Sequence, residues 1–357
     1  MTSSFRFLTF FPSIILSRIA RKTSNDPHVS EINNKADYSL DNIDNSDEEV
    51  KLPNDILEAL ERHDKGSKPN IEELEIINLA EEGEEPKEVK IGTRFTVEQR
   101  EALITLLREF HEIFAWSYQD MPGLDTNIVV HKIPLKPECK PVKQALRWMK
   151  PEIILKIKEE VEKKLKAGFL STVTYSNWVA NIVPVPKKDG KVRMCMDYQD
   201  LNRASLKDNF PLPHIDTQVD NIATNVVFSF MDGFSGYNQI KMAEEDKPKT
   251  AFVTHWGTFV YDVMPFGLKN VRATYQRAMV TLFHEMIHHE IEVYVDDMIA
   301  KSCTTQDHLT DLRKLFQCLK KYQLRLNSNK CAFGVTSGKL LGFIVSGKGI
   351  EIDPAKV

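Results

Sequence analysis

Cysteine is sparse in this sequence, and its placement argues against two kinds of small stabilised domain. The 357 residues include five cysteines, an odd number, and no two of them are spaced as CxxC. A disulfide framework and a structural zinc site both need paired cysteines, so we expect neither of them. This usage suits a reducing compartment, and we predict a cytoplasmic location.

Long hydrophobic runs are also missing. The longest apolar stretch, residues 7–16, contains Pro12 and is far shorter than the roughly 20 residues that a membrane-spanning helix needs. We therefore expect no membrane partner. Residues 1–22 carry several basic residues and no acidic one, which is typical of a transit or signal peptide. The alternative is that they are the arbitrary start of an incomplete reading frame.

An overall basic excess is the third feature that the chain lacks. Its net charge is −4, and 27% of its residues are charged. Acidic residues dominate before residue 90, whereas lysines and arginines recur among apolar runs from about residue 140 onward. We predict that residues 1–90 form a disordered or acidic leader. A polyanionic partner is expected only for the second part of the chain.

Hydrophobic periodicity predicts regular structure after this leader. Apolar residues at helical spacing predict a helix within 95–117, in a helical lead-in segment that covers residues 91–140. Residues 150–165 predict a second amphipathic helix. Two strands, 181–186 and 192–196, flank an Asp-Gly turn with three lysines. That tip is either a solvated turn or a basic finger that reaches phosphates.

The remaining part of the chain alternates strands and helices. The expected strands and helices are 226–231, 252–254, 259–263, 271–289 (a helix), 291–295, 298–300, 307–322 (a helix), 323–326 and 339–345. Such a succession is typical of a split βαβ unit, in which an antiparallel sheet carries its helices on one face. The fold class predicted is α+β.

Three carboxylates come together if this sheet forms. Asp232 ends one predicted strand, and Asp296-Asp297 occupies the turn of a predicted hairpin. Like charges at one sheet edge are unfavourable unless cations neutralise them, and Mg²⁺ prefers such oxygen ligands. Two ions held there suit phosphoryl transfer. The alternative is that the two acids only make a hairpin turn.

Further motifs carry a resemblance to a known family. In chain order they are KKDG (187–190), RMCMDY (193–198), LN (201–202), FPLP (210–213), MDGFSGY (231–237), KTAF (249–252), MPFGLKN (264–270), YVDD (294–297) and LGF (341–343). These segments resemble the reverse transcriptase domain of gypsy-class long-terminal-repeat retrotransposons, particularly those of plants. The resemblance covers about residues 140–357, and residues 95–140 resemble the lead-in between protease and polymerase.

The resemblance implies a right-hand polymerase that is truncated before the thumb. It assigns residues 141–357 to fingers, about 141–225, and palm, about 226–345. The implied activity is RNA-directed DNA polymerisation from deoxynucleoside triphosphates, on an RNA or DNA template with a primer. Two Mg²⁺ ions, with Mn²⁺ as a substitute, are the implied cofactors, and a virus-like particle of the element is an implied location. No particular oligomeric state is predicted.

The resemblance also implies roles for individual residues. The implied catalytic metal ligands are Asp232, Asp296 and Asp297. The residues implied to bind the incoming nucleotide are Lys188 and Arg193 at its phosphates, Tyr237 as the ring that excludes a 2′-hydroxyl, and Phe266, Gly267 and Gln276. The residues implied to contact the primer are Tyr294, Leu341 and Gly342.

Two departures and two competing hypotheses accompany the resemblance. Val271-Arg272 stands where the family has a small residue followed by Pro or Gly, and Gln199 stands where Arg is common. One competing hypothesis is an inactive, truncated fragment that folds and binds nucleic acid without polymerising. The other is a zinc protease, because HEMIH (284–288) satisfies the H-E-x-x-H pattern. On the predicted helix this pattern lies on the polar face, which favours a solvated surface.

Overall fold

The computed structural model describes residues 72–352, apart from gaps at 82, 187–191, 223, 341 and 348. They belong to one compact unit, Ser67–Val357. Its largest sheet has six strands in the order β1-β2-β11-β6-β10-β9. In that order the strands are Leu74–Asn78, Glu88–Gly92, Ala332–Val335, Val227–Asp232, Asp297–Ser302 and Ile291–Tyr294.

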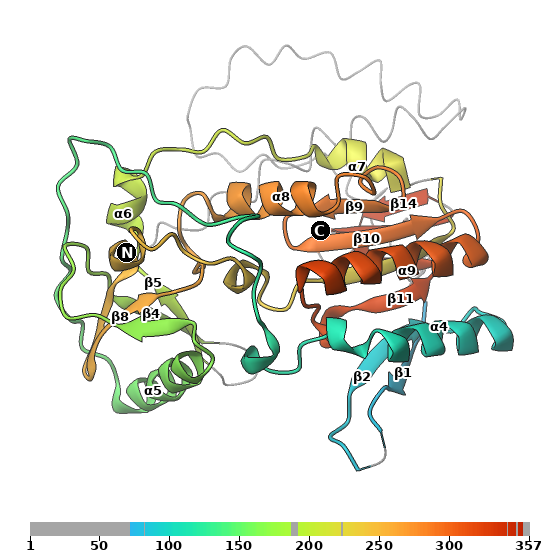
Figure 1. The fold of residues 1–357 in the computed structure, drawn as a ribbon, viewed down its shortest axis with the longest axis horizontal. Helices are drawn as coiled ribbons and strands as arrows, with labels where there is room; N and C mark the ends of the chain where they lie inside the picture. Colours follow the sequence, from blue (N-terminus) through green and yellow to red (C-terminus); the bar gives the residue numbers. More distant parts are fainter. Residues whose placement is uncertain are drawn as a thin grey trace, which may run out of the picture. The chain divides into compact units, whose positions relative to one another are not determined.

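The side chains of this sheet alternate between two hydrophobic layers. Met231 of β6 belongs to the main core, whereas Phe228 belongs to a second cluster, because successive side chains of a strand point to opposite faces. On the first face lie helices α4 (Val97–Glu109), α8 (Val271–Leu282) and α9 (Thr305–Tyr322), as Figure 1 shows. The two hydrophobic layers fix β6 and β10 firmly at the centre of the sheet.

The opposite face is covered by a shorter helix and a small sheet. Helix α7 (Ile215–Ile222) contributes Ile222 to the second cluster, and the three-stranded sheet contributes Leu340 and Val345. The strands of this sheet, in the order β12-β13-β14, are Ser337–Leu340, Phe343–Ser346 and Gly349–Ile352.

A second group of helices and strands corresponds to the fingers that the resemblance implies. Their elements are α5 (Pro151–Lys166), the hairpin β4–β5 (Ile182–Pro186 and Val192–Met196), α6 (Gln199–Ala204) and the sheet β3-β8-β7 (Leu170–Thr172, Gly257–Tyr261 and Phe252–Thr254). Pro151 begins α5, where its missing N–H costs nothing. The predicted hairpin of residues 181–196 is confirmed by the β4–β5 pairing. Its lysine-bearing tip lies outside the described residues.

Single-turn 3-10 helices connect these parts. They are η1 (His111–Ile113), η2 (Tyr118–Asp120), η3 (Gly236–Gln239), η4 (Lys247–Thr250) and η5 (Ser328–Lys330). Two of them, η3 and η5, lie next to Asp232 in sequence or in space and therefore shape the edge of the palm.

The prediction of a disordered leader over residues 1–90 is wrong for residues 72–90. Strands β1 and β2 pair with each other, and β2 continues into the palm sheet alongside β11. Val89 and Ile91 are fully buried. Acidic residues outnumber the apolar residues in this stretch, so its composition did not predict two short strands. Burial of the apolar residues stabilises these strands. The helical lead-in contains α4 but is otherwise largely irregular.

Several predicted boundaries also need correction. The helix predicted at 271–289 ends at Leu282, and residues 323–326 form only isolated bridges at Leu326. Strand β8 pairs with β3 on one side and with β7 on the other, so neither β7 nor β8 joins the palm sheet. The chain therefore returns to the fingers between β6 and α8, so fingers and palm are not the continuous segments 141–225 and 226–345. Strand β11, which the sequence did not indicate, pairs with β6 on the side opposite β10.

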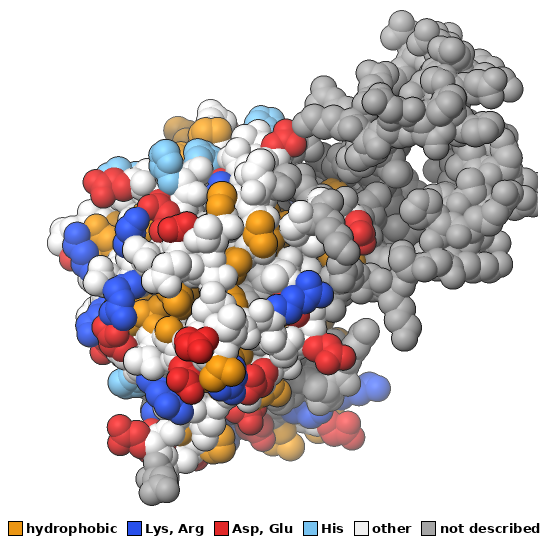
Figure 2. Space-filling model, turned by 90° about the vertical axis from the view of Figure 1, so that its right-hand side faces the viewer, with side chains coloured by type: hydrophobic (Ala, Val, Ile, Leu, Met, Phe, Trp, Pro, Cys, Tyr) orange, Lys and Arg blue, Asp and Glu red, His pale blue; other side chains and the backbone are white. Residues whose placement is uncertain are grey.

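Charges of both signs are mixed on the surface. On the face in Figure 2, acidic and basic side chains lie interspersed rather than gathered into fields of one sign. Ion pairs tie α9 to the lead-in segment, with Arg313 contacting Glu109 and Lys320 contacting Glu112. None of the helices in the described part of the chain is long and apolar enough to cross a membrane.

Candidate active site

Strand register brings the three aspartates to one edge of the palm sheet. Asp232, the last residue of β6, pairs with Asp297, the first residue of β10, and Asp297 also pairs with Tyr294 of β9. Asp296 lies in the turn between β9 and β10. The predicted juxtaposition of a strand end and a hairpin turn is therefore confirmed. One antiparallel pairing accounts for it.

The turn itself is strained, and a buried side chain supports it through hydrogen bonds. Val295 has a φ of 53°, a left-handed conformation that costs a β-branched residue about 1–3 kcal/mol. Its N–H donates to Oε1 of Gln276 at 2.7 Å, and Nε2 of Gln276 donates to the carbonyl of Val293 at 3.2 Å. Gln276 thus holds the end of β9 and the first residue of the turn, and its two hydrogen bonds compensate for the strain.

This geometry corrects the role that the resemblance implied for Gln276. Its side chain is 1% exposed, and both ends of its amide bind hairpin backbone. It positions the hairpin from the interior and does not face a nucleotide. Gln218 of α7 donates to the same Val293 carbonyl at 2.8 Å. Two glutamines from different helices therefore donate hydrogen bonds to the same backbone carbonyl of β9.

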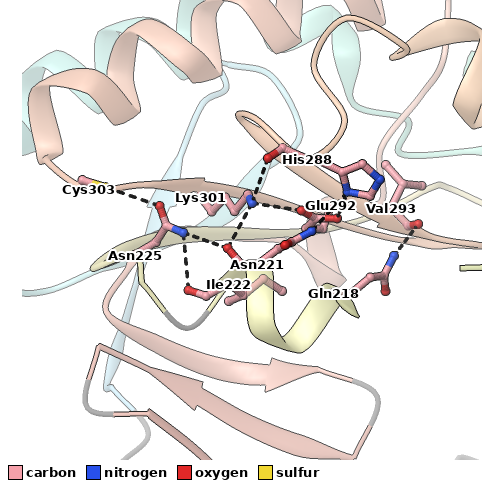
Figure 3. Close-up of polar contacts among 9 residues, drawn as sticks. All are labelled: Gln218, Asn221, Ile222, Asn225, His288, Glu292, Val293, Lys301 and Cys303. Atoms are coloured by element: carbon pink, nitrogen blue, oxygen red, sulfur yellow. Dashed lines mark hydrogen bonds and ion pairs between the residues drawn. The ribbon is translucent and has the colours of Figure 1, made fainter. Parts of the chain in front are cut away.

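A buried ion pair anchors the far end of the hairpin. Lys301 and Glu292, on adjacent strands, lie 2.9 Å apart with side chains that are 4% and 1% exposed. Figure 3 shows that Lys301 also donates to the backbone carbonyl of Asn221, at 3.0 Å, while Glu292 meets the ring of His288. Each buried charge has several partners, as burial of a charge demands. The network ties α7 to the hairpin.

The pKa values of Asp296 and Asp297 are raised. Burial, followed by the charges of Asp232 and Asp297, raises the pKa of Asp296 to about 7. Burial and the Asp232 charge also raise the pKa of Asp297. Oδ1 of Asp296 is buried and has no hydrogen-bond partner among the described residues. The charges of Lys330 and Arg272 lower the pKa of Asp296, but burial and the two neighbouring carboxylates outweigh them.

Lys330 supplies one positive charge that the sequence did not point to. Its Nζ lies 2.5 Å from Oδ2 of Asp232, and η5 brings it there from nearly a hundred residues downstream. An open cleft of about 160 Å³ is lined by Asp232, Asp297, Lys330 and Lys339. No short motif marks Lys330, so only the fold reveals it.

The donor set of this edge fits a hard divalent cation. Within the described residues, no three His, Cys, Asp or Glu side chains converge closely enough to enclose a metal ion. Mg²⁺, however, usually keeps several waters and shares phosphate oxygens with a substrate, so it does not require a closed protein cage. The unpartnered oxygen of Asp296 and the raised pKa values of Asp296 and Asp297 are what an ion would relieve.

An aromatic pair lies beside the triad. Tyr237 is 6% exposed, and its ring centroid lies 4.8 Å from that of Phe266, which is 51% exposed. Burial, and then the charge of Asp296, raises the pKa of the Tyr237 hydroxyl, and a hydrogen bond from the guanidinium of Arg272 opposes this rise. The departure at residue 272 thus places a cation in direct contact with the predicted gate. Phe266 forms the exposed surface of the pair.

The structure describes some of the other residues predicted for this site and leaves two of them undescribed. Gly267, with a φ of 98°, accepts a hydrogen bond from Asn202 at its carbonyl. Arg193 is exposed on β5, and Tyr294 is half-buried beside the aspartates. Gly342 has a φ of 95° in the turn after β12. Lys188 and Leu341 lie outside the described residues, so their roles stay predictions.

The H-E-x-x-H pattern does not form a metal site. Helix α8 ends at Leu282, so His284 and His288 do not share one helical face. Both side chains are more than half exposed, at 68% and 57%. The segment is a turn that leads into β9, not the solvated helix face that the sequence favoured.

Comparison with known families agrees with this geometry. The family described as "Reverse transcriptase (RNA-dependent DNA polymerase)" matches residues 185–345, a range that contains all three aspartates. This chain carries a reverse transcriptase domain. The Retrovirus-related Pol polyprotein from transposon opus of Drosophila melanogaster is 34% identical over 205 residues, which are 56% of this chain and 20% of that protein.

A second fly relative supports the same class. The Retrovirus-related Pol polyprotein from transposon gypsy is 33% identical over 211 residues, or 56% of this chain and 20% of that protein. The reverse transcriptase chain thus spans about a fifth of the length of these curated relatives. The assignment to a gypsy-class element is confirmed, and the assignment to plant elements stays a prediction.

Solved structures show the same fold. The foamy viral protease-reverse transcriptase in complex with an RNA/DNA hybrid matches with a TM-score of 0.67 and 23% identity. The match covers 73% of this chain and 35% of that one. The predicted α+β fingers-and-palm fold is therefore confirmed for this reverse transcriptase domain.

Proposed function

We propose that this chain is an RNA-directed DNA polymerase that adds deoxynucleotides to a primer on an RNA or DNA template. The observation that carries the proposal is the β6–β10 register, which places Asp232 opposite Asp297 with Asp296 in the adjoining turn. Support for the nucleic-acid partners comes from foamy viral structures of the same fold, which are complexes with an RNA/DNA hybrid and with double-stranded DNA.

We propose Mg²⁺, as two ions, for the cofactor, with Mn²⁺ as a substitute. When bound, such ions activate the primer 3′-hydroxyl and stabilise the leaving pyrophosphate. Asp296 and Asp297 offer them oxygens at the sheet edge. Asp232 contributes once Lys330 gives up Oδ2, and the freed ammonium then remains beside the phosphates in the cleft.

Other residues select and orient the nucleotide. The ring of Tyr237, together with the more exposed ring of Phe266 that it contacts, excludes a 2′-hydroxyl by steric clash. Arg193, together with Lys188, meets the triphosphate. Tyr294 and the turn at Leu341-Gly342 hold the primer end. Positioning and charge neutralisation are most of what phosphoryl transfer requires of a protein.

One observation favours the competing hypothesis of an inactive fragment. Lys330 already neutralises Asp232 at 2.5 Å, so a cation must compete with it for that oxygen. A chain that keeps this pair would fold and bind nucleic acid without polymerising. The cytoplasmic location and the virus-like particle predicted from the sequence stay predictions.

Primer extension on poly(rA)/oligo(dT) with Mg²⁺ tests the proposal. The wild-type chain should extend the primer, and Asp296→Asn should not. Asp125→Asn is a matched control, because Asp125 is an exposed residue outside the site whose side chain accepts from the backbone N–H of Asn127, a bond that asparagine can keep. If wild type extends no better than Asp296→Asn but both bind the hybrid, the inactive-fragment hypothesis is correct.

A further inference from the structure

The hydroxyl of Tyr275 is a buried polar group without a visible purpose. Tyr275 lies in α8 with 0% exposure, and its ring packs edge-on against Tyr237 with centroids 5.4 Å apart. Its hydroxyl makes no hydrogen bond to any residue that the structure describes. Burying a hydroxyl without a partner is unfavourable, and phenylalanine at this position would avoid the cost. Such a group needs an explanation.

The glycines after Asp232 show where this hydroxyl points. A Cβ added to Gly233 would lie 2.8 Å from the Tyr275 hydroxyl, and one added to Gly236 would lie 2.9 Å from it. Both contacts are shorter than real Cβ atoms make, so the two glycines leave room for the hydroxyl. It is therefore lodged directly beneath the turn that follows Asp232.

A second unpartnered atom borders the same space. The Cβ position on Gly236 is also 2.9 Å from Oδ1 of Asp296, the buried oxygen that has no hydrogen-bond partner in the described part of the chain. One of these atoms is a hydrogen-bond donor and the other is an acceptor. Burial, and then the charge of Asp296, raises the pKa of Tyr275 well above its usual value, so the hydroxyl keeps its proton.

We propose that Tyr275 is a positioning residue for Asp296. Its hydroxyl donates a hydrogen bond to Oδ1, through a small rotation of the carboxylate or one bridging water, and this directs Oδ2 toward the cation. The inference rests on the proposed function, since it assumes that Asp296 is a metal ligand. Partners that orient a ligating carboxylate in this way commonly change metal affinity by about 10–100-fold.

Tyr275→Phe tests the inference with a readout other than activity. The change removes one oxygen and keeps the ring that packs on Tyr237. Binding of Mn²⁺ to the full chain, without nucleotide, is measured by the paramagnetic resonance signal of the free ion. We expect about tenfold weaker Mn²⁺ binding, an unchanged KM for the deoxynucleotide and a higher Mg²⁺ requirement in primer extension.

Tyr261→Phe is the matched control. Tyr261 is also buried, and its hydroxyl lies 3.4 Å from Nζ of Lys164 in the fingers. This variant should bind Mn²⁺ as the wild type does. Unchanged Mn²⁺ binding in Tyr275→Phe, together with lost binding in Asp296→Asn, overturns the inference and leaves the proposed function intact. If the wild-type chain binds no Mn²⁺ at all, the inference and the proposed metal centre fail together.

Discussion

At the scale of single residues, the three aspartates work against the stability of the metal-free protein. They are partly buried and they repel one another, and within the described residues only Asp232 forms an ion pair. Groups arranged in this way are typical of sites where function, rather than folding, determines the residue. The cost should be visible as a pH dependence of stability.

Asp296→Asn should stabilise the metal-free protein at pH 8. The pKa of Asp296 is about 7 in the fold, well above its ordinary value of 3.8. The folded state therefore holds this proton more tightly, and the stability that the proton provides is lost as the pH rises through about 7. Asparagine removes that loss.

The gain is measured by denaturant unfolding in EDTA at several pH values. It should reach at least about 1.4 kcal/mol at pH 8, the equivalent of one pKa unit, and should shrink toward zero near pH 4. Asp125→Asn should show no such trend. A stability difference between Asp296→Asn and wild type that is the same at pH 5 and pH 8 would contradict the pKa assigned to Asp296.

Tyr237→Ala should weaken the choice between deoxyribonucleotides and ribonucleotides. Removing the ring removes the surface that clashes with a 2′-hydroxyl, and we expect discrimination between dTTP and UTP to fall at least about tenfold, or about 1.4 kcal/mol. Incorporation of each nucleotide on poly(rA)/oligo(dT) measures it. Tyr237→Phe keeps the ring and should keep the selection. Equal discrimination in all three proteins would remove Tyr237 from this role.

Single residues differ in how readily their sequence context reveals them. The aspartates are marked by apolar strands on both sides and by a motif, so their meeting could be predicted. Lys330 comes from a short turn with no periodic pattern, and its contact with Asp232 depends on where η5 packs. Gln276 is a residue that the resemblance assigns to the nucleotide, and only its burial shows that it supports the hairpin instead.

At the scale of elements, the β9–β10 hairpin depends on two helices that do not belong to it. Gln276 of α8 and Gln218 of α7 both donate to the Val293 carbonyl, but only Gln276 also accepts from Val295. The two side chains therefore make a natural pair for comparison. They are both almost fully buried.

Gln276→Met should cost more than Gln218→Met. The first change leaves the buried N–H of Val295 without a partner, which costs about 1–3 kcal/mol, and it should also slow primer extension because the turn loses its support. The second leaves Val293 with its bond from Gln276. Urea unfolding and extension rates are measured for both variants. A larger loss in Gln218→Met would show that the bond to Val295 does not hold the turn.

Helices and strands also differ in how well the sequence predicts their position. The period of α9 predicts its position well, because its apolar stripe is long. The pattern of α8 continues past Leu282 in the sequence, but the chain must turn there to reach β9, and His288 adopts a positive φ of 69°. Strand β11 is too short, and follows too irregular a turn, for alternation to identify it.

At the scale of the whole molecule, the folded unit begins earlier than composition indicates. Glu72 is 5% exposed and accepts hydrogen bonds from Thr93 and Arg94 on one side and from Thr336 on the other. It joins the segment after β2 to the junction of β11 and β12. In an acidic stretch this residue resembles its exposed neighbours, and only tertiary structure distinguishes it.

Glu72→Ala should therefore destabilise the protein, whereas Glu73→Ala should not. Losing a buried acceptor of several hydrogen bonds should cost at least about 2 kcal/mol, against a change within about 0.5 kcal/mol at the exposed neighbour. Thermal and urea unfolding of both variants measure the difference. Similar stabilities would mean that residues 72–92 do not belong to the palm.

The most direct measurement for the whole molecule is the single-turnover rate of adding one deoxynucleotide to a primer with Mg²⁺. Asp232→Asn, Asp296→Asn and Asp297→Asn are each compared with wild type, alongside their affinity for the primer–template. We predict a measurable wild-type rate, a loss of at least about 1000-fold in each variant, and affinity for the duplex within a few-fold of wild type. An Asn variant that keeps a rate within tenfold of wild type would contradict a shared metal centre.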